Sequence, residues 1–208
     1  AAAIMLKGMT AEYLIRRTYK VMSGQTVLFH AAAGGVGLIA CQWLKAIGAT
    51  VIGTVGSHEK SELAKANGCD HTILYKEEDF VDKVKAITNG KGVPVVYDSV
   101  GKDTALNSLD CLSSLGLLVI FGNSSGNAPA IEPGLLATKG SLYVTRPTLF
   151  NYNDTREKLM ESANQVFSMV RSGKVSIKIG AQYDLKDAVQ AHKDLEARKT
   201  TGCIILRP

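Results

Sequence analysis

A glycine-containing segment near the start of the chain joins an apolar, β-branched run to a helix-forming run. Thr26–His30 is the apolar run, and the small-residue segment Ala31–Gly37 follows it. Aligned to the pattern G-x-G-x-x-G, Ala32 takes the first position, Gly34 the second and Gly37 the third. The missing Cβ at Gly34 would let a pyrophosphate approach the backbone, where the unpaired N–H groups of a new helix attract negative charge. The segment predicts a dinucleotide-binding turn.

Two residues of this turn have packing roles as well. Gly37 would let the helix and the preceding strand approach closely. Ala32 departs from the strict pattern, but alanine fits a tight turn whose φ is negative. The departure therefore leaves the prediction in place.

The second strand indicates which dinucleotide would bind. In an NAD site this strand ends in Asp or Glu, whose carboxylate binds the adenosine ribose. Here the strand ends at Gly56-Ser57, and Glu59 and Lys60 follow. A lysine beside a serine suits a 2′-phosphate, so NADPH is favoured over NADH. In the competing interpretation, Ser57 caps the next helix, Glu59 is an acidic residue in the first turn that the helix dipole stabilises, and Lys60 lies in solvent.

Composition excludes several classes of protein. The chain has 208 residues, 46% of them hydrophobic and 21% charged, which is typical of a soluble globular protein. Its apolar runs are shorter than the roughly 20 residues of a membrane span, and we see no signal peptide. The net charge of +5 is dispersed among acidic residues, which argues against a nucleic-acid partner. The four scattered cysteines form no zinc or disulfide pattern, which favours a reduced, cytoplasmic protein without metal.

Short apolar runs alternate with single helical patterns along most of the chain. A helical pattern at Tyr13–Val21 comes before the first strand. The strand candidates are Thr26–His30, Thr50–Val55, His71–Leu74, Val93–Tyr97, Leu117–Phe121 and Ser141–Val144. The helical patterns between them are Val36–Ile47, Glu59–Ala66, Phe80–Thr88 and Thr104–Leu112. This alternation predicts an α/β fold with a doubly wound, six-stranded parallel sheet of the Rossmann type.

The pattern changes after Arg146-Pro147. A long helical pattern covers about Thr155–Arg171 and is followed by a short run at Val175–Ile179. A further helix near Asp187–Ala197 and a last strand at Gly202–Leu206 complete the chain. We expect this tail to be a different structural unit.

Four segments together resemble one known family. They are Phe29–Gly37, Gly53–Gly56, Val96–Gly101 and Phe121–Gly126, and Gly140–Pro147 strengthens the match to bacterial members. They look like the NADPH:quinone oxidoreductases, which belong to the zinc-free branch of the medium-chain dehydrogenases/reductases and include zeta-crystallin. The resemblance runs from about Leu6 to the C-terminus.

The resemblance implies a set of residues that contact NADPH. Lys60 and Tyr75 would contact the 2′-phosphate with Ser57 nearby, and Gly34, Gly35, Val36 and Gly37 would border the pyrophosphate. Ser99, Val100, Phe121, Gly122, Asn123 and Ser124 would lie near the nicotinamide and its ribose, with Thr10 beside the nicotinamide and Arg198 reaching the cofactor.

Structural roles compete with several of these assignments. Tyr75 could close a strand, Asn123 and Ser124 could stabilise a turn, and Arg198 could be a charge at a helix C-terminus. Asp98 ends a strand, where an acid often orders a turn. The four histidines show no partner pattern for metal or triad chemistry, so we expect surface or strand-end histidines.

The resemblance also implies a domain organisation. Residues 1–146 would form the NADPH-binding Rossmann domain with a leading helix, and residues 147–208 would return to a GroES-like substrate domain. Family members carry most of that domain before the nucleotide domain, and this chain starts at Ala1 without an initiating methionine. We therefore expect a fragment, with a naturally small reductase as the alternative.

The implied activity is hydride transfer from NADPH to a quinone without zinc. A carbonyl or enoyl reductase of the same superfamily would share almost every motif. A non-catalytic NADPH- or RNA-binding protein and a purely structural protein are further alternatives. Ser141–Val144 would be an edge strand, and relatives pair this edge in a homodimer, so we expect a homodimer.

One prediction follows from the expected absence of half the active site. The chain alone should bind NADPH but reduce quinones poorly, because one wall of the quinone pocket belongs to the substrate domain in the family. Steady-state NADPH oxidation with a quinone checks this. A turnover near that of a full-length relative would contradict it.

Overall fold

The computed structural model describes residues 1–197 and 199–208 of the chain. Its main feature is a six-stranded sheet in which all neighbouring strands run parallel, in the order β3-β2-β1-β4-β5-β6. The strands are β1 Thr26–Phe29, β2 Thr50–Val55, β3 His71–Leu74, β4 Val93–Asp98, β5 Leu112–Ile120 and β6 Tyr143–Thr145. This order is that of a doubly wound sheet, so the predicted fold class is confirmed.

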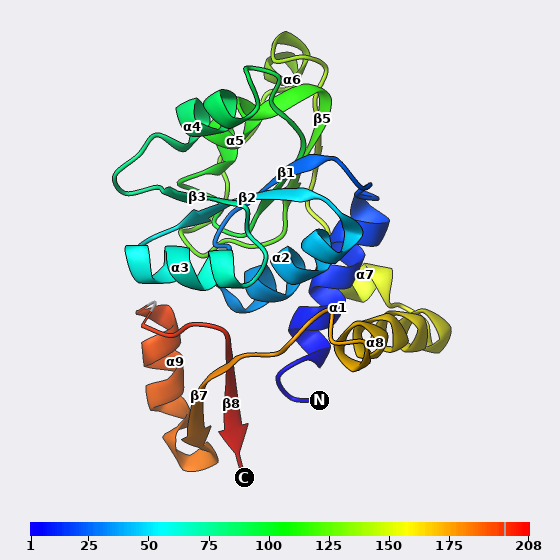
Figure 1. Ribbon diagram of the computed structural model, residues 1–208, viewed down its shortest axis with the longest axis vertical. Helices are drawn as coiled ribbons and strands as arrows, with labels where there is room; N and C mark the ends of the chain where they lie inside the picture. Colours follow the sequence, from blue (N-terminus) through cyan, green and yellow to red (C-terminus); the bar gives the residue numbers. More distant parts are fainter. Residues whose placement is uncertain (198) are drawn as a thin grey trace.

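Helices cover both faces of this sheet (Figure 1). The helices that accompany the sheet are α1 Met5–Tyr13, α2 Gly35–Ile47, α3 His58–Ala66, α4 Phe80–Ile87, α5 Ala105–Leu109 and α6 Pro133–Thr138. Alternate residues of β1 separate the two layers: Val27 and Phe29 pack in the core on the side of α1 and α2, whereas Leu28 packs in the core with residues of α4 and α5. Strands buried on both faces need apolar residues at every position, which explains their continuous apolar runs.

Local signals in the sequence set several element ends. Gly48 ends α2 with a left-handed φ of 89°, a conformation that glycine adopts without a Cβ penalty. Ser57 caps α3, because its Oγ accepts a hydrogen bond from the backbone N–H of Lys60 at 3.3 Å. Asp79 caps α4 by accepting from the N–H groups of Val81 and Asp82.

The tail forms a separate arrangement. It contains α7 Leu149–Tyr152, α8 Arg156–Arg171, a two-stranded parallel sheet of β7 Ile179–Asp184 and β8 Cys203–Arg207, the short 3₁₀ helix Leu185–Asp187 and α9 Ala188–Glu196. In Figure 1, β7, β8 and α9 lie apart from the six-stranded sheet, whereas α8 lies beside α1. Gly8 of α1 allows this contact, since a Cβ there would lie 2.6 Å from Cγ1 of Val166.

A partly buried ion pair in the first helical segment is hydrogen-bonded to the tail. Arg17 lies in the π-helix Leu14–Thr18 that continues α1, and its Nη2 is 2.9 Å from Oε2 of Glu12. The same guanidinium donates to the carbonyl of Tyr152 at 2.8 Å, and the Ser162 hydroxyl donates to Glu12 at 2.9 Å. Removing one partner of such a pair would leave an uncompensated buried charge. These bonds therefore fix α7 and α8 against the start of the chain.

Two sequence expectations about elements were wrong. The helix expected at Tyr13–Val21 begins at Met5 and ends in the π-helix at Thr18, because α1 packs on α2 and α8. The helix expected at Thr104–Leu112 stops at Leu109, because Leu112 pairs with Val93 in the sheet. The short run Val175–Ile179, for which the sequence indicated no element type, leads into β7: Val175 packs in the core, its N–H donates to the carbonyl of Met169, and the strand begins at Ile179.

The close approach of α2 to the turn before it can be tested by substitution. A Cβ on Gly37 would lie 2.5 Å from the carbonyl oxygen of Ala31 and 2.6 Å from that of Ala32, and backbone atoms cannot move aside cheaply. We expect Gly37→Ala to lower the free energy of unfolding by about 1–3 kcal/mol in urea titrations.

Gly134→Ala is the matched control for this measurement. Gly134 lies in α6, and a Cβ added there would have no heavy atom within 4 Å. Alanine at this position should leave stability unchanged or raise it by up to about 1 kcal/mol. Equal effects of the two substitutions would show that the approach at Gly37 is not tight.

Candidate functional site

The turn between β1 and α2 presents backbone rather than side chains to the space above the sheet. Ala31 takes the left-handed φ of 54°, whereas the sequence pattern had pointed to Ala32 for the tight turn. The N–H of Gly34 donates to the carbonyl of Ala31 at 2.8 Å. Among the described residues, no side chain caps α2 at Gly34, in contrast to the capped starts of α3, α4 and α8. The first N–H groups of α2 are thus available to an anion.

The partner strand makes room for this turn. A Cβ on Gly53 of β2 would lie 2.5 Å from the Cβ of Ala32 and 2.6 Å from Sγ of Cys69. The N–H of Ala32 donates to the carbonyl of Thr54 at 3.1 Å. The glycine in β2 therefore lets the turn lie directly against the neighbouring strand.

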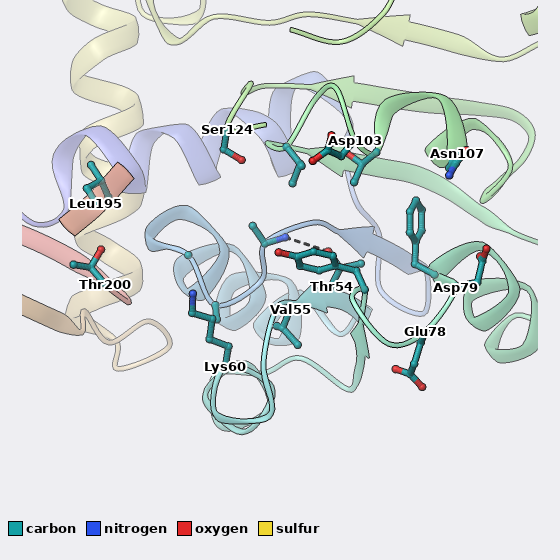
Figure 2. Close-up of a pocket in the computed structure, with 18 residues that line it drawn as sticks. Thr54, Val55, Lys60, Glu78, Asp79, Asp103, Asn107, Ser124, Leu195 and Thr200 are labelled. Atoms are coloured by element: carbon teal, nitrogen blue, oxygen red, sulfur yellow. Dashed lines mark hydrogen bonds between the residues drawn. The ribbon is translucent and has the colours of Figure 1, made fainter. Parts of the chain in front are cut away.

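A cavity of about 580 Å³ opens at the carboxyl ends of the strands, beside this turn (Figure 2). Parallel sheets bind ligands at this edge, and the volume is in the usual range for a small-molecule site. The lining residues are Ala31, Ala33, Gly34, Thr54, Val55, Gly56, Lys60, Tyr75, Glu78, Asp79, Phe80, Val100, Asp103, Thr104, Asn107, Ser124, Leu195 and Thr200. Five of the predicted site residues are among them: Gly34, Lys60, Tyr75, Val100 and Ser124.

The end of β2 forms one side of the cavity. Val55 ends the strand and is followed directly by Gly56 and Ser57 rather than by an acid, and Lys60 extends from α3 toward the cavity, as Figure 2 shows. Tyr75 follows β3, and its hydroxyl lies 3.0 Å from the position that a Cβ on Gly56 would take. Ser57 caps α3 as the competing interpretation expected, but Lys60 lines the cavity as the cofactor interpretation expected.

The remaining predicted residues lie around the cavity or away from it. Gly35, Val36 and Gly37 form the first turn of α2, and Ser99 follows β4. The ring of Phe121 packs against that of Phe29, with the ring centroids 5.6 Å apart. Gly122 and Asn123 line a second cavity of about 250 Å³, together with Ile120, Asn127, Ala128 and Arg146.

Two predicted residues are not placed at the cofactor site by the structure. Thr10 lies in α1, where its hydroxyl donates to the carbonyl of Leu6 at 2.7 Å, and it lines neither of the two cavities. Such a bond within one helical turn is a local role. Arg198 lies outside the described residues.

Sequence reasoning missed the far side of the cavity. Phe80 begins α4, Asp103 and Asn107 follow β4, and Leu195 and Thr200 come from the tail. Asp79 had a detectable signal as a helix cap, and Asp103 lies in the loop between β4 and α5. Leu195 and Thr200 carry no signal of this kind, because only the folded tail brings them to the glycine turn, Ala31–Gly37.

Charges in the cavity are unevenly distributed. Among the described lining residues, Lys60 is the cation, and Glu78, Asp79 and Asp103 are the acids. Lys83 and the N–H of Leu74 bind the Glu78 carboxylate at 2.8 and 2.9 Å and hold its pKa below the ordinary value. In Figure 2 this carboxylate points away from Lys60. Lys60 is therefore the feature of the lining that would attract a phosphate.

Asp98 orders the loop after β4, as expected of an acid at a strand end. Its Oδ1 accepts from the N–H groups of Val100 and Gly101 at 2.7 and 3.0 Å. Its Oδ2 accepts from the hydroxyl of Thr104 at 2.7 Å and from that of Ser108 at 3.5 Å. The carboxylate is completely buried. Its hydrogen bonds satisfy the buried charge and fix the loop that carries Val100 into the cavity.

His30 was only partly anticipated as a strand-end histidine. It directly follows β1, but its imidazole is completely buried, with hydroxyl partners on both ring nitrogens. His58, His71 and His192 are exposed. His30 differs because parallel packing places the residue after β1 between β2 and α5.

The described residues contain neither a membrane-spanning helix nor a metal cluster. Within residues 1–197 and 199–208, no helix is long and apolar enough to cross a membrane. In the same residues, no three His, Cys, Asp or Glu side chains gather as a metal site, and the four cysteines are buried free thiols. The fold and the glycine turn define a doubly wound α/β domain of the Rossmann class.

Comparison with known proteins identifies the family. A family model described as zinc-binding dehydrogenase matches residues 35–165, more than half of the chain, and the chain belongs to this family. The chain is 53% identical over 208 residues to a quinone oxidoreductase of Pseudomonas aeruginosa, covering 100% of this chain and 64% of that protein. The predicted resemblance to the quinone oxidoreductases is thereby confirmed.

Solved structures and a second kind of relative extend the comparison. The crystal structure of Escherichia coli quinone oxidoreductase complexed with NADPH matches with a TM-score of 0.97 and 53% identity, covering 100% of this chain and 64% of that one. A 2-haloacrylate reductase of Burkholderia sp. is 47% identical over 208 residues, covering 100% of this chain and 62% of that protein. The chain thus spans less than two thirds of the length of these relatives.

The structural role of Asp98 gives a testable prediction. Asp98→Asn replaces one acceptor oxygen by an NH₂ group that faces donors, so a charged, buried hydrogen bond is lost. We expect the free energy of unfolding in urea to fall by about 1.5–3 kcal/mol. Asp103→Asn, in the same loop at the cavity, is the control and should change stability by about 0.5 kcal/mol at most. Equal effects of the two variants would contradict the assignment.

Proposed function

We propose that this chain binds NADPH and forms the cofactor-binding part of a reductase that transfers a hydride from NADPH to a quinone. The observation that supports this most directly is the end of β2. The two residues directly after Val55 are Gly56 and Ser57, not an acid, and Lys60 and Tyr75 line the cavity that begins at the glycine turn. A lysine at this place favours the 2′-phosphate that distinguishes NADPH from NADH.

The described residues fit such a cofactor along the cavity. Lys60 and Tyr75 would hold the 2′-phosphate, with Ser57 at the start of α3 nearby. Gly34, Gly35, Val36 and Gly37 would hold the pyrophosphate, because the uncapped start of α2 offers N–H groups to its charge. Ser99, Val100, Phe121, Gly122, Asn123 and Ser124 would border the nicotinamide and its ribose. Thr10 and Arg198 remain assignments that only the family resemblance supports.

The protein contributes orientation rather than covalent chemistry. NADPH, when bound, supplies the hydride. The loops after β4 and β5 would hold one face of the nicotinamide toward the acceptor and exclude water, so that the reacting groups meet in a fixed geometry. Asp98 and its bonds to Val100 and Gly101 keep the first of these loops in place.

Several further features belong to this proposal. Residues 1–146 would be the NADPH-binding domain, and residues 147–208 would belong with the substrate domain. A homodimer would form through the edge strand β6, where Tyr143 is 60% exposed and an unpaired sheet edge is available. A quinone or another small carbonyl compound would be the acceptor.

A second function has support from one comparison. The relative named 2-haloacrylate reductase is 47% identical to this chain. Reduction of an activated carbon–carbon double bond uses the same cofactor site and differs only in the acceptor. Parallel assays with a quinone and with a haloacrylate, each with NADPH, separate the two functions by their relative turnover.

Lys60 provides the test of cofactor choice. If Lys60 pairs with the 2′-phosphate, Lys60→Ala should weaken NADPH binding by about 1.5–3 kcal/mol and change NADH binding little. Fluorescence titration with both cofactors measures this difference.

Lys65→Ala is the matched control for Lys60→Ala. Lys65 lies on the same helix, α3, but pairs with Glu62 and is absent from the cavity lining. Its replacement should leave the affinity for both cofactors unchanged. Equal losses of NADPH and NADH affinity in Lys60→Ala would refute the role of Lys60.

A further inference from the structure

His30 lies beneath the glycine turn and contacts three other elements. Its Nδ1 is 2.9 Å from the hydroxyl oxygen of Thr54 in β2, and its Nε2 is 2.9 Å from that of Ser108 in α5. The ring of Phe80 from α4 meets the imidazole edge-on, with the centroids 5.0 Å apart. No part of the side chain is exposed. The proposed mechanism does not use this buried titratable group.

The neighbouring hydrogen bonds determine which ring nitrogen carries the proton. The Ser108 hydroxyl donates to Asp98, so it accepts from Nε2–H of His30. In the neutral ring Nδ1 is then an acceptor, so the Thr54 hydroxyl donates to it, while the Thr54 oxygen accepts from the N–H of Ala31 at 3.3 Å. The Ser108 end of the ring therefore assigns the neutral tautomer with the proton on Nε2, and the contacts of Thr54 fit this tautomer.

These bonds form one directed chain between the two loops that flank the cavity. It runs from the N–H of Ala31 through Thr54, His30 and Ser108 to the carboxylate of Asp98. At its end, Asp98 holds the N–H groups of Val100 and Gly101. At its start, Thr54 holds the first residues of the glycine turn. His30 is the link between these two ends.

The start of the chain carries backbone strain. Ala31 has a φ of 54°, in the left-handed region that residues other than glycine rarely adopt. Such a conformation persists only where the surroundings enforce it. Thr54 supplies two of these constraints, through its hydroxyl to the N–H of Ala31 and through its carbonyl to that of Ala32. Both Ala31 and Thr54 also line the cavity.

We propose that His30 is a positioning residue for cofactor binding: its neutral imidazole orients Thr54, and Thr54 holds Ala31 in the conformation that opens the glycine turn to a pyrophosphate. The role rests on the proposed function in that NADPH is the ligand. His30 does not itself line the cavity and acts through Thr54, which does.

Protonation of His30 would disturb this arrangement. A second ring proton on Nδ1 would face the hydrogen of the Thr54 hydroxyl, which must then turn away and lose its acceptor. Burial lowers the pKa of His30 below 6.5, and the charge of Asp98 partly opposes this shift. The other groups that face the ring are uncharged: the hydroxyls of Thr54 and Ser108 and the ring of Phe80. Since the neutral form binds the cofactor, affinity is full above pH 6.5 and falls as the pH drops through the lowered pKa.

Two substitutions separate positioning from simple packing. His30→Asn places an amide oxygen near the position of Nδ1, where it can accept from Thr54, and it does not titrate. His30→Leu fills the space but leaves the hydroxyls of Thr54 and Ser108 without their partner. We expect the Kd for NADPH at about pH 7.5 to rise about tenfold in His30→Leu, the effect of one lost buried hydrogen bond, and less than about threefold in His30→Asn.

The pH dependence of the Kd distinguishes His30 from the cofactor's own phosphate. The 2′-phosphate also titrates near about pH 6, so its contribution is present in the wild type and in His30→Asn alike. Between about pH 5 and 8, the wild type should lose more affinity on acidification than His30→Asn does. The exposed His71, changed to Leu, is the control and should behave like the wild type.

A measurement without cofactor tests the same role independently of the proposed function. Amide hydrogen exchange at Ala31 should be at least about tenfold faster in His30→Leu than in the wild type, and close to wild type in His30→Asn. Nitrogen NMR of the His30 ring should show the proton on Nε2. If the wild type binds no NADPH, the proposed function fails, while exchange at Ala31 still decides the role of His30.

Several results would overturn the positioning role. It is wrong if His30→Leu leaves amide exchange at Ala31 within about twofold of the wild type. It is also wrong if the His30→Asn and His30→Leu variants lose NADPH affinity equally, or if the ring proton of His30 resides on Nδ1. Should His30→Leu not fold, the ring spectrum of the wild type and the pH curve of His30→Asn still give the answer.

Discussion

The close backbone contact between α2 and the turn that precedes it determines where everything else in the site lies. Gly37 has no side chain, so the first turn of α2 rests directly on the carbonyl groups of Ala31 and Ala32. This contact fixes the start of the helix at the carboxyl edge of the sheet. The free N–H groups of the helix then face the same space as the ends of β2 and β4. A side chain at Gly37 would separate the helix from the strand and move this set of donors.

The sheet brings chemically different groups together around that contact. Parallel strands end at one edge, so the loops after β1, β2 and β4 meet there although they are far apart in the sequence. The loop after β1 contributes backbone donors, the segment after β2 contributes Lys60, and the loop after β4 contributes Val100 and Asp103. The interior bonds of Asp98 and His30 lie directly beneath these loops. The cavity is thus supported by a satisfied buried polar network rather than by apolar packing alone.

Much of this could be predicted from the sequence, because the signals involved are local. β2 and β3 have the expected bounds, since each is a short apolar run between turn residues. The position of Lys60 at the cavity was predictable, because the segment after the second strand lies at a defined place relative to the glycine turn. Capping by Ser57 was equally visible and is observed, whereas the role of Lys60 toward a cofactor stays a prediction.

The remaining features depend on long-range contacts that no local pattern encodes. The first helix begins earlier than expected because Gly8 packs on Val166 of α8, more than 150 residues further along the chain. Leu112 follows a helical pattern but pairs with Val93, since the ladder of β4 and β5 determines its conformation. The burial of His30 required knowing that β2 and α5 enclose the residue after β1. The same holds for Phe80 and Asn107, which only the strand order brings to the cavity.

Leu195 and Thr200 line the same cavity as the glycine turn, although they belong to the C-terminal tail. A ligand that contacts both parts makes the docking of the tail and the occupancy of the cavity one coupled equilibrium. Every opening of the tail away from the sheet would then have to release those contacts first, so a saturating ligand would lower the population of opened tail in proportion to its concentration over its Kd. The two-stranded sheet of β7 and β8 thereby becomes sensitive to a molecule that it does not itself touch.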